Sequence, residues 1–361
     1  MSKKSLLIIN RAQFGYHTDS FKYCQYLKND FNITYICFYG DKEKISEDGV
    51  EVVYVPYKGS FIYRGIGFIR NCRQYIKSNK IDLIFIVYFQ MSSLLRIGMP
   101  SNKFILDIRT GAIGTTAKKR KIDDTLMSLE SKAFKHITII SESLRDKFGL
   151  RGEKCHILPL GADELSTTDK SFDSMKLLFV GTFLSRNIEE TIFGISQFLE
   201  KIDHKKVEME ITYDIFGFGT VEEEVLVKNA IMETGLEDIV KFHGRKNHED
   251  LKFYYDNCNI GITYVPLIDY FECQPPTKIF EYARAGLLGI STSTLENKRL
   301  ITEDNGVLCD DTVGSFSDAL ENIYINREKF DSRKIRKTLA NYSWNNIVNN
   351  NLATYLKQIG K

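Results

Sequence analysis

Short apolar runs alternate with amphipathic stretches along the first half of the chain. Continuous apolar runs bounded by polar loops are typical of strands buried on both faces of a parallel sheet. Helical periodicity separates several of these runs, notably at 62–77 and 126–134. The predicted strands are Leu6–Ile9, Ile33–Tyr39, Val50–Val55, Ile81–Tyr88, Phe104–Ile108 and His136–Ile140.

The second half repeats this scheme. Helical stretches at 189–198, 222–233, 278–284 and 316–324 lie between apolar runs. We therefore predict an α/β protein with two Rossmann-like, doubly wound domains, whose facing sheets share a cleft beyond the carboxyl ends of their strands. The predicted domains are residues 1–160 and 161–340, and a final helix within 341–361 returns toward the first domain. The predicted strands of the second half are Lys176–Val180, Ile211–Phe216, Ile239–Phe242, Ile260–Tyr264, Leu288–Ser291 and Val307–Cys309.

The composition is that of a globular protein, with 43% apolar and 27% charged residues among 361. No apolar run approaches the roughly 20 residues that a membrane-spanning helix requires. The seven cysteines are dispersed, which favours reduced thiols in the cytoplasm over a disulfide framework or a zinc site. No Asp-x-Asp pair is present, so we expect no metal site, and we expect no nucleic-acid partner.

Charge is unevenly distributed around the net value of +2. Residues 1–165 contain 26 Lys and Arg against 17 Asp and Glu, whereas residues 166–361 contain 23 against 30. Residues 57–80 combine isoleucines at helical spacing with Arg64, Arg70, Arg73 and Lys77. Such a helix either lies on an anionic membrane or packs its apolar stripe on a sheet, and both interpretations stay open. The run at 118–121 is predicted as a polar, mobile stretch.

The segment from Pro266 to Gly286 is the most informative of the chain, since three of the six prolines lie between 266 and 276. It leads into a short helix with Thr277 as the expected N-cap and Gly286 as the expected stop. Free backbone N–H groups, the helix dipole and Lys278 then lie together, which suits a diphosphate. Glu281, one turn later, could accept hydrogen bonds from ribose hydroxyls. The alternative is a surface ion pair between Lys278 and Glu281.

A second candidate phosphate loop follows the first strand of the second half. Gly181 ends this strand, and a short loop leads to Arg186 before the next helix. A departing nucleoside diphosphate requires fixed cations or a metal, and Arg186 with Lys278 could supply that charge. The alternative is an ordinary surface arginine. A third glycine signal, at 216–219, is predicted to be a structural turn.

The loop after the first strand of the chain contains candidate groups for an acceptor. Gly15 could let the backbone approach phosphates, and His17 or Asp19 could polarise an acceptor hydroxyl. The alternative is that Thr18 or Asp19 only caps the following helix. Asp107 and Arg109, at the end of another strand, are further cleft candidates, unless they only pair with each other.

Taken in order, these segments resemble the donor domain of glycosyltransferase family 4, the glycosyl transferases group 1. The resemblance covers residues 155–350 well and the first half only loosely. The matching segments are Ile157–Asp163, Val180–Gly181 with Arg186–Asn187, Phe216–Gly219, Val240–Gly244, Pro276–Gly286 and Asn305–Leu308.

The resemblance implies a GT-B architecture and a retaining, metal-independent transfer from a UDP- or GDP-linked sugar, with no cofactor. It assigns Glu281 to the ribose hydroxyls, and Arg186 and Lys278 to the diphosphate. The amides near Pro276 and Thr277 would face the phosphate or the sugar, and the Gly244–Arg245 loop would border the base.

Two departures from the family pattern affect the expected identity of the donor sugar and the expected binding of the phosphates. The family often has a Glu eight residues before the ribose-binding Glu, where this chain has Cys273, with Glu272 one position away. Many members have Arg directly after the phosphate-loop glycine, where this chain has Thr182.

These observations predict a cytoplasmic glycosyltransferase that adds a sugar to a saccharide, as in surface polysaccharide biosynthesis. If residues 57–80 contact the inner face of the membrane, a lipid-linked acceptor follows. Two alternatives stay open: a sugar-nucleotide epimerase of the same fold, and a non-catalytic adaptor associated with membranes. A nicotinamide-dependent oxidoreductase is disfavoured, because neither half has Gly-x-Gly-x-x-Gly after its first strand.

Overall fold

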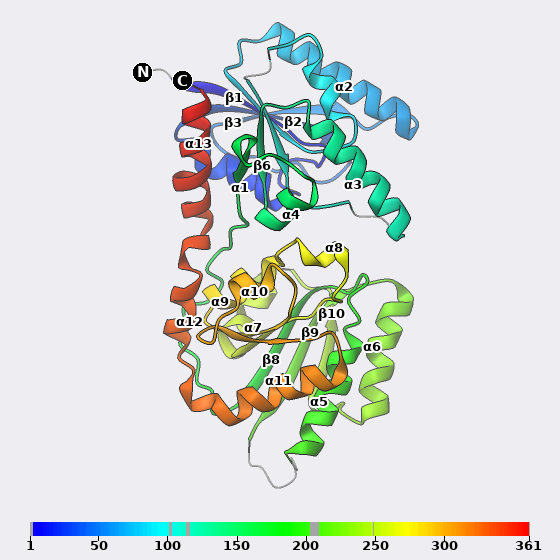
Figure 1. The fold of residues 1–361 in the computed structure, drawn as a ribbon, viewed down its shortest axis with the longest axis vertical. Helices are drawn as coiled ribbons and strands as arrows, with labels where there is room; N and C mark the ends of the chain where they lie inside the picture. Colours follow the sequence, from blue (N-terminus) through cyan, green and yellow to red (C-terminus); the bar gives the residue numbers. More distant parts are fainter. Residues whose placement is uncertain (1–2, 101–102, 113–115, 203–208, 248, 361) are drawn as a thin grey trace. The chain divides into compact units, whose positions relative to one another are not determined.

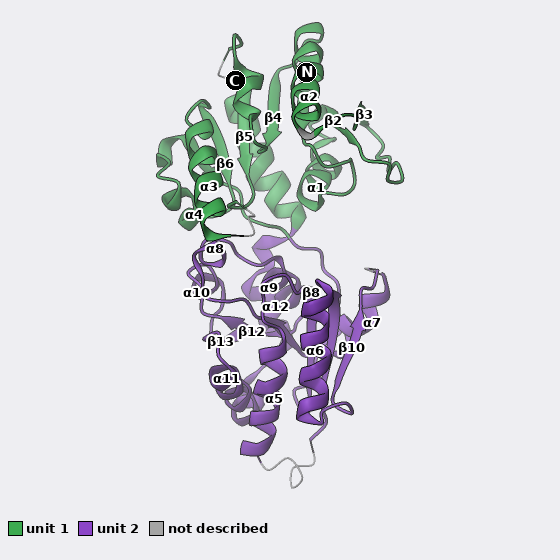
Figure 2. Ribbon diagram, turned by 90° about the vertical axis from the view of Figure 1, so that its right-hand side faces the viewer, with its two compact units in different colours: residues 1–161, 344–361 green, residues 162–343 purple. Residues whose placement is uncertain are grey.

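The computed structural model describes residues 3–100, 103–112, 116–202, 209–247 and 249–360. It divides into two compact units (Figure 2). Unit 1 comprises residues 1–161 and 344–361, and unit 2 comprises residues 162–343. The chain therefore passes from one unit to the other twice, and its C-terminal segment belongs to unit 1.

Within its described residues, unit 1 contains a seven-stranded parallel sheet of order β3-β2-β1-β4-β5-β6-β7 (Figure 1). The six apolar runs predicted in this half all form strands, and the runs of β1, β4 and β5 are the most deeply buried, whereas β3 lies at the sheet edge and is mostly half-buried. β7, a short strand of half-buried residues at the sheet edge, lacks an apolar run and was not predicted. The strands are β1 (Lys4–Ile9), β2 (Phe31–Tyr39), β3 (Val50–Pro56), β4 (Leu83–Val87), β5 (Phe104–Ile108), β6 (His136–Ile139) and β7 (Cys155–Ile157).

The helices of unit 1 include two that differ from the sequence prediction. The run at 118–121, predicted as a polar stretch, lies in the first turns of α3, where the Thr116 hydroxyl accepts a hydrogen bond from the Lys119 backbone N–H at 3.2 Å. The final helix contains a wide π-helical segment, η8, before its regular end. The helices are α1 (Thr18–Leu27), α2 (Phe61–Ser78), η1 (Ser92–Arg96), α3 (Ala117–Ser131), α4 (Glu142–Lys147), η3 (Gly152–Lys154), η8 (Asn346–Leu352) and α13 (Ala353–Ile359).

Unit 2 contains a six-stranded parallel sheet of order β10-β9-β8-β11-β12-β13 among its described residues. All six predicted strands are confirmed, and the predicted doubly wound α/β class is confirmed with them. The strands are β8 (Met175–Thr182), β9 (Ile211–Phe218), β10 (Val240–Gly244), β11 (Ile260–Thr263), β12 (Leu288–Thr292) and β13 (Gly306–Cys309).

Helices cover both faces of this second sheet (Figure 1). They are α5 (Glu189–Lys201), α6 (Val221–Thr234), η5 (Glu249–Leu251), α7 (Lys252–Asn257), α8 (Asp269–Glu272), α9 (Thr277–Arg284), α10 (Asn297–Leu300), α11 (Val313–Asn326), η6 (Arg327–Lys329), α12 (Ser332–Thr338) and η7 (Ala340–Tyr342).

Gly261, in the middle of β11, allows α9 to pack closely on the sheet. A Cβ atom at this position would lie 2.3 Å from Cγ of Tyr282. That ring is held by its hydroxyl, which accepts a hydrogen bond from the Val180 N–H at 2.9 Å. We expect Gly261→Ala to lower the free energy of unfolding by about 1–3 kcal/mol through overpacking, measured by urea denaturation. Gly314→Ala is the control, because a Cβ at Gly314 meets nothing within 4 Å. An unchanged midpoint for Gly261→Ala would contradict this packing.

Candidate functional site

The two central strands of unit 2, β8 and β11, mark the point where the chain changes direction across the sheet. From β8 it continues to β9 on one side, and from β11 to β12 on the other. In open α/β sheets, ligands bind outside the carboxyl ends of the strands at such a point. Arg186 follows β8, and the proline-rich loop with α9 follows β11. The topology therefore brings the two predicted anion-binding segments to the same edge.

The loop after β8 is held in an unusual conformation. Ser185 and Asn187, on either side of Arg186, have positive φ angles of 53° and 50°. A left-handed backbone costs a residue with a side chain about 1 kcal/mol or more, and it persists where the surroundings fix it. Here the Ser185 N–H donates to Oε1 of Glu223 at 2.9 Å, and the Arg186 N–H donates to the Phe183 carbonyl at 2.9 Å. The loop thereby fixes the direction of the Arg186 side chain.

Arg186 directs its guanidinium over the end of β8. A Cβ atom on Gly181 would lie 3.0 Å from Nη1 of Arg186, so glycine leaves the space that the guanidinium occupies. Among the residues that the structure describes, no carboxylate forms an ion pair with Arg186. Burial lowers the pKa of this guanidinium, and the nearby Tyr270 and Tyr282 oppose that effect. A half-buried cation without a carboxylate partner is suited to bind an anion.

Lys278 and Glu281 interact with each other on α9, as the alternative interpretation of this motif predicted. Lys278 Nζ donates to Oε2 of Glu281, and the buried Tyr255 hydroxyl donates to the same oxygen at 2.9 Å. Burial, together with the Glu281 charge, raises the pKa of Tyr255 well above its usual value, so the hydroxyl stays a donor. Glu281 is thus held from two sides. This is more than a surface ion pair, because Tyr255 comes from a different helix, α7.

The start of α9 differs from the predicted capping. Pro276, not Thr277, is the N-cap, and its side chain makes no capping hydrogen bond. Thr277 is the first helical residue and is exposed. Gly286 follows the helix with φ of +80°, as expected for a residue that ends one. Since proline has no hydroxyl, the N-cap side chain does not accept hydrogen bonds from the first N–H groups of α9 as a serine or threonine would.

Tyrosines join the two segments around the end of β8. The Tyr282 hydroxyl ties α9 to the β8 backbone through Val180, and Tyr282 also interacts with Arg186. Tyr270, on α8 before the proline loop, interacts with Arg186 as well. On the other side, the Tyr264 hydroxyl donates to Oε2 of Glu190 at 2.6 Å, which fixes the first turn of α5 to the end of β11. Arg186 is therefore within electrostatic reach of both elements that flank the proline-rich loop.

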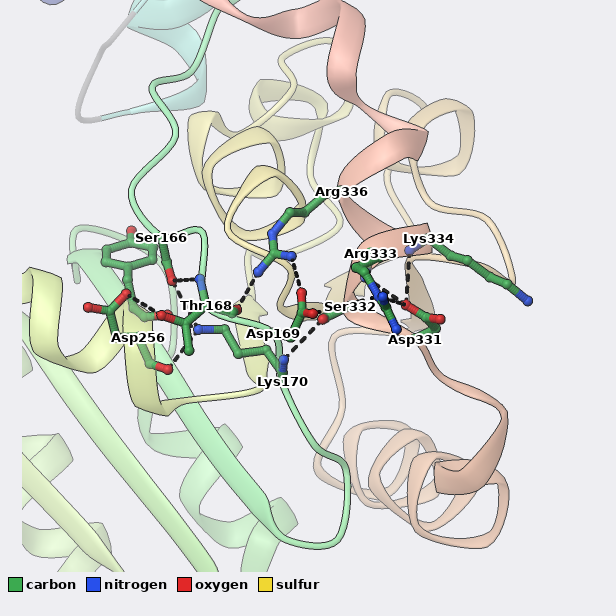
Figure 3. A network of polar contacts seen from close by, with 11 residues as sticks. Ser166, Thr168, Asp169, Lys170, Asp256, Asp331, Ser332, Arg333, Lys334 and Arg336 are labelled. Carbon is green, nitrogen blue, oxygen red and sulfur yellow. Dashed lines mark hydrogen bonds and ion pairs between the residues drawn. The ribbon is translucent and has the colours of Figure 1, made fainter.

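A polar network supports α7, the helix that carries Tyr255 (Figure 3). Lys170 Nζ donates to the backbone carbonyls of Tyr255 and Asp256 at 2.5 and 2.8 Å. Its backbone N–H donates to the Ser332 hydroxyl at 3.0 Å. Arg336, on α12, forms an ion pair with Asp169 at 2.7 Å. Burial lowers the pKa of Lys170 to about 8, because partial removal from water disfavours the charged ammonium. This network holds the backbone of α7 at Tyr255 and so supports the position from which the Tyr255 hydroxyl contacts Glu281.

The predicted base-binding loop lies at the end of β10. Gly244 has φ of +68°, and the guanidinium of Arg245 lies 4.9 Å from the centre of the Phe218 ring. Residues 216–219 were predicted to form a turn, but Gly217 lies inside β9. A Cβ there would lie 2.1 Å from the Gly181 carbonyl oxygen, so glycine permits the close approach of β8 and β9. The turn prediction failed because a Gly-x-Gly pattern occurs both in turns and in strands that approach a neighbouring strand closely.

The residues that depart from the pattern of the resembling family have different surroundings. Oε2 of Glu272 accepts a hydrogen bond from the Leu295 N–H at 2.7 Å, so this carboxylate is engaged with the turn after β12. Cys273 is buried. Thr182 is the last residue of β8 and is exposed.

In unit 1, Asp19 and Arg109 form a buried ion pair. Nε of Arg109 lies 2.7 Å from Oδ2 of Asp19, and the arginine side chain is only 6% exposed. Its Nη1 also donates to the Leu158 carbonyl at 2.6 Å. Arg109 thus connects the first turn of α1 to the segment that leaves unit 1. The pairing engages one oxygen of Asp19 and gives that carboxylate a structural role, while its role toward an acceptor hydroxyl stays a prediction.

His17, rather than Thr18 or Asp19, is the N-cap of α1. Its Nδ1 accepts a hydrogen bond from the Ser20 N–H at 3.3 Å, so the proton of the neutral ring lies on Nε2. Burial lowers the pKa of His17, Asp19 opposes this shift and Arg109 reinforces it. A neutral His17 is thus a hydrogen-bond donor through Nε2. Gly15, just before it, has φ of +88°, and a Cβ there would lie 2.3 Å from the Ile45 side chain.

The prediction that Asp107 faces a cleft is wrong. Asp107 lies inside β5 and is fully buried, where its Oδ1 accepts a hydrogen bond from the Thr138 hydroxyl at 2.7 Å. Burial raises its pKa to about 7, although Arg109 and Thr138 act in the opposite direction. Its other oxygen has no hydrogen-bond partner. The error arose because both faces of β5 are covered along its whole length, so a position near the end of this strand is buried whichever face its side chain lies on.

The described residues contain no group of three or more His, Cys, Asp or Glu that could hold a metal ion. Sequence reasoning missed the tyrosines of the site, namely Tyr255, Tyr264, Tyr270 and Tyr282. Tyr255 is 26 residues from its partner Glu281, and Tyr282 is 102 residues from Val180. No local spacing could have indicated these contacts.

Comparison with known proteins supports the fold. No known family model matches the chain, and no curated protein matches it. Among solved structures, sucrose-phosphate synthase from Thermosynechococcus elongatus is similar over 99% of both chains, with a TM-score of 0.78 and 13% identity. HepE of Anabaena in complex with UDP is similar over 98% of this chain and 100% of that chain, with a TM-score of 0.72 and 12% identity.

A third similar structure is the lipopolysaccharide outer core galactosyltransferase WaaB. It matches over 98% of this chain and 99% of that chain, with a TM-score of 0.69 and 13% identity. At these identities the likeness establishes the fold. The two Rossmann-like units of this chain are those of the GT-B fold, as the resemblance predicted.

Proposed function

We propose that this chain is a glycosyltransferase of family 4 that transfers a sugar from a nucleotide-sugar donor to a saccharide. The observation that carries the proposal is Arg186, a half-buried guanidinium that has no carboxylate partner within the described part of the chain. It lies over Gly181 and beside the tyrosines that flank the α9 loop. The likeness to HepE bound to UDP and to UDP-glucose supports a UDP-linked donor, with a GDP-linked one as the other choice.

Each group of the site has a distinct task in this proposal. Arg186, Lys278 and the first amides of α9, at Pro276 and Thr277, bind the diphosphate. Glu281 accepts hydrogen bonds from the ribose hydroxyls, and Gly244 with Arg245 borders the base. Lys278, which is paired with Glu281 in this structure, is shared with the diphosphate when the donor binds. These fixed cations then stabilise the negative charge that develops on the leaving diphosphate.

The proposed reaction retains the anomeric configuration and uses no divalent metal. The acceptor hydroxyl oxygen bonds to the anomeric carbon on the face from which the diphosphate leaves, as the bond between that carbon and the diphosphate oxygen breaks. The hydroxyl proton passes to a phosphate oxygen, so no side-chain nucleophile is needed. Two cations and a helix N-terminus supply the positive charge that a metal would otherwise provide.

The acceptor is a saccharide, and the likeness to WaaB supports a role in surface polysaccharide biosynthesis. Unit 1 supplies the acceptor site, with Gly15 near the donor phosphates. His17 is expected to donate through Nε2 to an acceptor oxygen, and Asp19 to orient the acceptor hydroxyl. Residues 57–80 are proposed to contact an anionic membrane at the cytoplasmic face, where a lipid-linked saccharide is available.

The proposal is tested by a thermal-shift screen with UDP, GDP and their sugars. A donor at a hundredfold excess over its dissociation constant adds about 2.7 kcal/mol of stability. The stabilising donor is then assayed for nucleotide release with saccharide acceptors, with and without EDTA. We expect release that requires an acceptor and persists in EDTA. Turnover without acceptor would instead indicate an epimerase, loss in EDTA would contradict metal independence, and no donor binding would contradict the whole proposal.

Tyr255 is expected to position Glu281 for the ribose. Tyr255→Phe removes a hydrogen bond to a carboxylate, and we expect donor affinity to fall about 3- to 10-fold, measured by calorimetry. Tyr213→Phe is the matched control. It removes a buried hydroxyl of the same unit that bonds to Thr191 at 3.1 Å instead of to a site residue. Wild-type donor affinity in a folded Tyr255→Phe variant would contradict this positioning role.

A further inference from the structure

An unusually basic stretch of unit 1 has no role in the proposed transfer. Residues 52–106 contain eight Lys and Arg but a single acidic residue, Asp82. The Asp82 carboxylate is directed to the backbone, where it accepts a hydrogen bond from the Ser5 N–H at 2.8 Å. α2 itself contains four cations and no acidic residue. The positive charge of this stretch is therefore not neutralised by its own sequence.

α2 also exposes large apolar side chains along one face. Ile62, Tyr63 and Ile66 are 69%, 76% and 50% exposed. The spacing of Ile62 and Ile66 places them one turn apart on the helix surface. The packing alternative left open by the sequence applies only to the inner face, where Phe68 and Cys72 are buried. Half or more of the surface of each outer isoleucine is exposed to solvent, and an apolar patch of this kind is typical of a surface that a partner covers.

α3 has the same character, although the sequence predicted a helix only from residue 126. Ile122, Leu126 and Leu129 are 59%, 38% and 56% exposed and recur at i, i+4 and i+7. Its first turns carry the cations of the 118–121 run. Thus a second amphipathic helix presents an apolar stripe beside positive charge.

η1 connects the two helices into one surface. Both α2 and α3 contact η1, and both helices lie on the same side of unit 1, the side facing the viewer in Figure 2. Nη1 of Arg73 donates to the Leu94 carbonyl at 2.7 Å, which fastens η1 to α2. Met91 and Ile97, at the two ends of η1, are exposed. The α2–η1–α3 surface is defined here as the exposed residues of these three elements.

A groove of about 520 Å³ lies between α2 and η1. Its apolar lining includes Ile66, Ile69, Met91 and Leu94, and Arg70 and Lys77 stand on its α2 side. An apolar groove flanked by cations is complementary to an anionic lipid, which has apolar chains and a negatively charged headgroup. An acyl chain fits the apolar lining, and a phosphate headgroup fits the cations.

We propose that the α2–η1–α3 surface docks on an anionic lipid bilayer, with the apolar stripes of α2 and α3 inserted between headgroups. Nucleic acid would also satisfy the charge, but interfaces with nucleic acid are polar, and aliphatic stripes on two helices favour a bilayer. None of the described helices is long and apolar enough to cross a membrane. Docking extends the contact proposed for residues 57–80 to two further elements, η1 and α3.

The test is flotation of the full chain with vesicles of phosphatidylcholine, with and without phosphatidylglycerol. We expect binding only with phosphatidylglycerol, and weaker binding as salt rises. Each cation near an anionic leaflet contributes about fivefold to binding, so Arg70→Gln with Lys77→Gln should weaken it about 25-fold. Leu126→Gln with Leu129→Gln should weaken it at least about tenfold, because α3 loses its apolar stripe.

A matched control is available on α6 of unit 2. There Val225 and Met232 are exposed at comparable levels, but the first turn of the helix is acidic. Val225→Gln with Met232→Gln should leave vesicle binding unchanged. Equal partitioning of the wild type to both vesicle types would overturn the proposal. So would undiminished binding by both α2 and α3 variants, or binding to RNA in place of vesicles. No donor is present in this assay, so docking and sugar transfer can fail independently.

Discussion

Replacing Arg186 with methionine is expected to lower kcat with the preferred donor by two to three orders of magnitude. Removal of one fixed group that stabilises developing charge typically costs that much. Arg186 has no carboxylate partner among the described residues, so its charge is available to the leaving diphosphate. The measurement is the rate of nucleotide release at saturating donor and acceptor.

One further variant at position 186 separates charge from geometry, and a variant elsewhere serves as its control. Arg186→Lys keeps the charge but loses the planar fork, and an intermediate loss is expected. Arg327→Met is the control for a lost arginine, because Arg327 lies at the end of α11 and donates to the Tyr324 carbonyl at 2.7 Å. A folded Arg186→Met variant with a kcat within about twofold of wild type would remove Arg186 from the mechanism.

The loop around Arg186 shows what the sequence could and could not specify. The strand before it and the helix after it follow from apolar periodicity, which is a local property. The direction of the guanidinium depends on positive φ at Ser185 and Asn187, and on a hydrogen bond to Glu223, 38 residues later. Neither Ser nor Asn at these positions identifies such a conformation, because both adopt many others. The sequence therefore located Arg186 without its orientation.

The same division applies to α9 and to unit 1. The helix, its glycine stop and the pair of Lys278 with Glu281 were predictable, since all are contacts within one turn. The hydroxyl of Tyr255 reaches Glu281 only because Lys170 and α7 are fixed elsewhere in the unit. In unit 1, the burial of Asp107, which raises its pKa to about 7, depends on the elements that cover both faces of β5. Tertiary packing, and not local pattern, decides these features.

The charges on α2 and α3 give a further contrast. The amphipathic character of α2 was visible in the sequence, but both membrane docking and packing on the sheet were compatible with it. Phe68 is buried and Ile62 is exposed, so α2 has an apolar inner face that packs within unit 1 and an apolar outer face toward solvent. For α3, the sequence predicted a helix from residue 126, but the run of cations at 118–121 was predicted as a mobile stretch, so the full length of the apolar stripe was not recognised.

Replacing Glu281 with alanine is expected to weaken donor binding about 100-fold, because two hydrogen bonds from ribose hydroxyls to a carboxylate contribute roughly 3 kcal/mol together. The same substitution releases Lys278 from its ion pair, which favours anions at α9. Glu281→Ala should therefore bind inorganic pyrophosphate at least as well as wild type, whereas Lys278→Met should lose pyrophosphate affinity.

This opposite response distinguishes recognition of the ribose from a general loss of the site. Calorimetry with the nucleotide donor and with pyrophosphate measures both affinities on each variant. Glu321→Ala is the matched control, because Glu321 also pairs with a lysine of unit 2, Lys201, at 3.5 Å but lies on α11. If Glu281→Ala lost affinity for pyrophosphate and donor in equal measure, Glu281 would act by holding Lys278, and the ribose assignment would fail. If donor affinity were unchanged, the carboxylate would have no part in donor recognition.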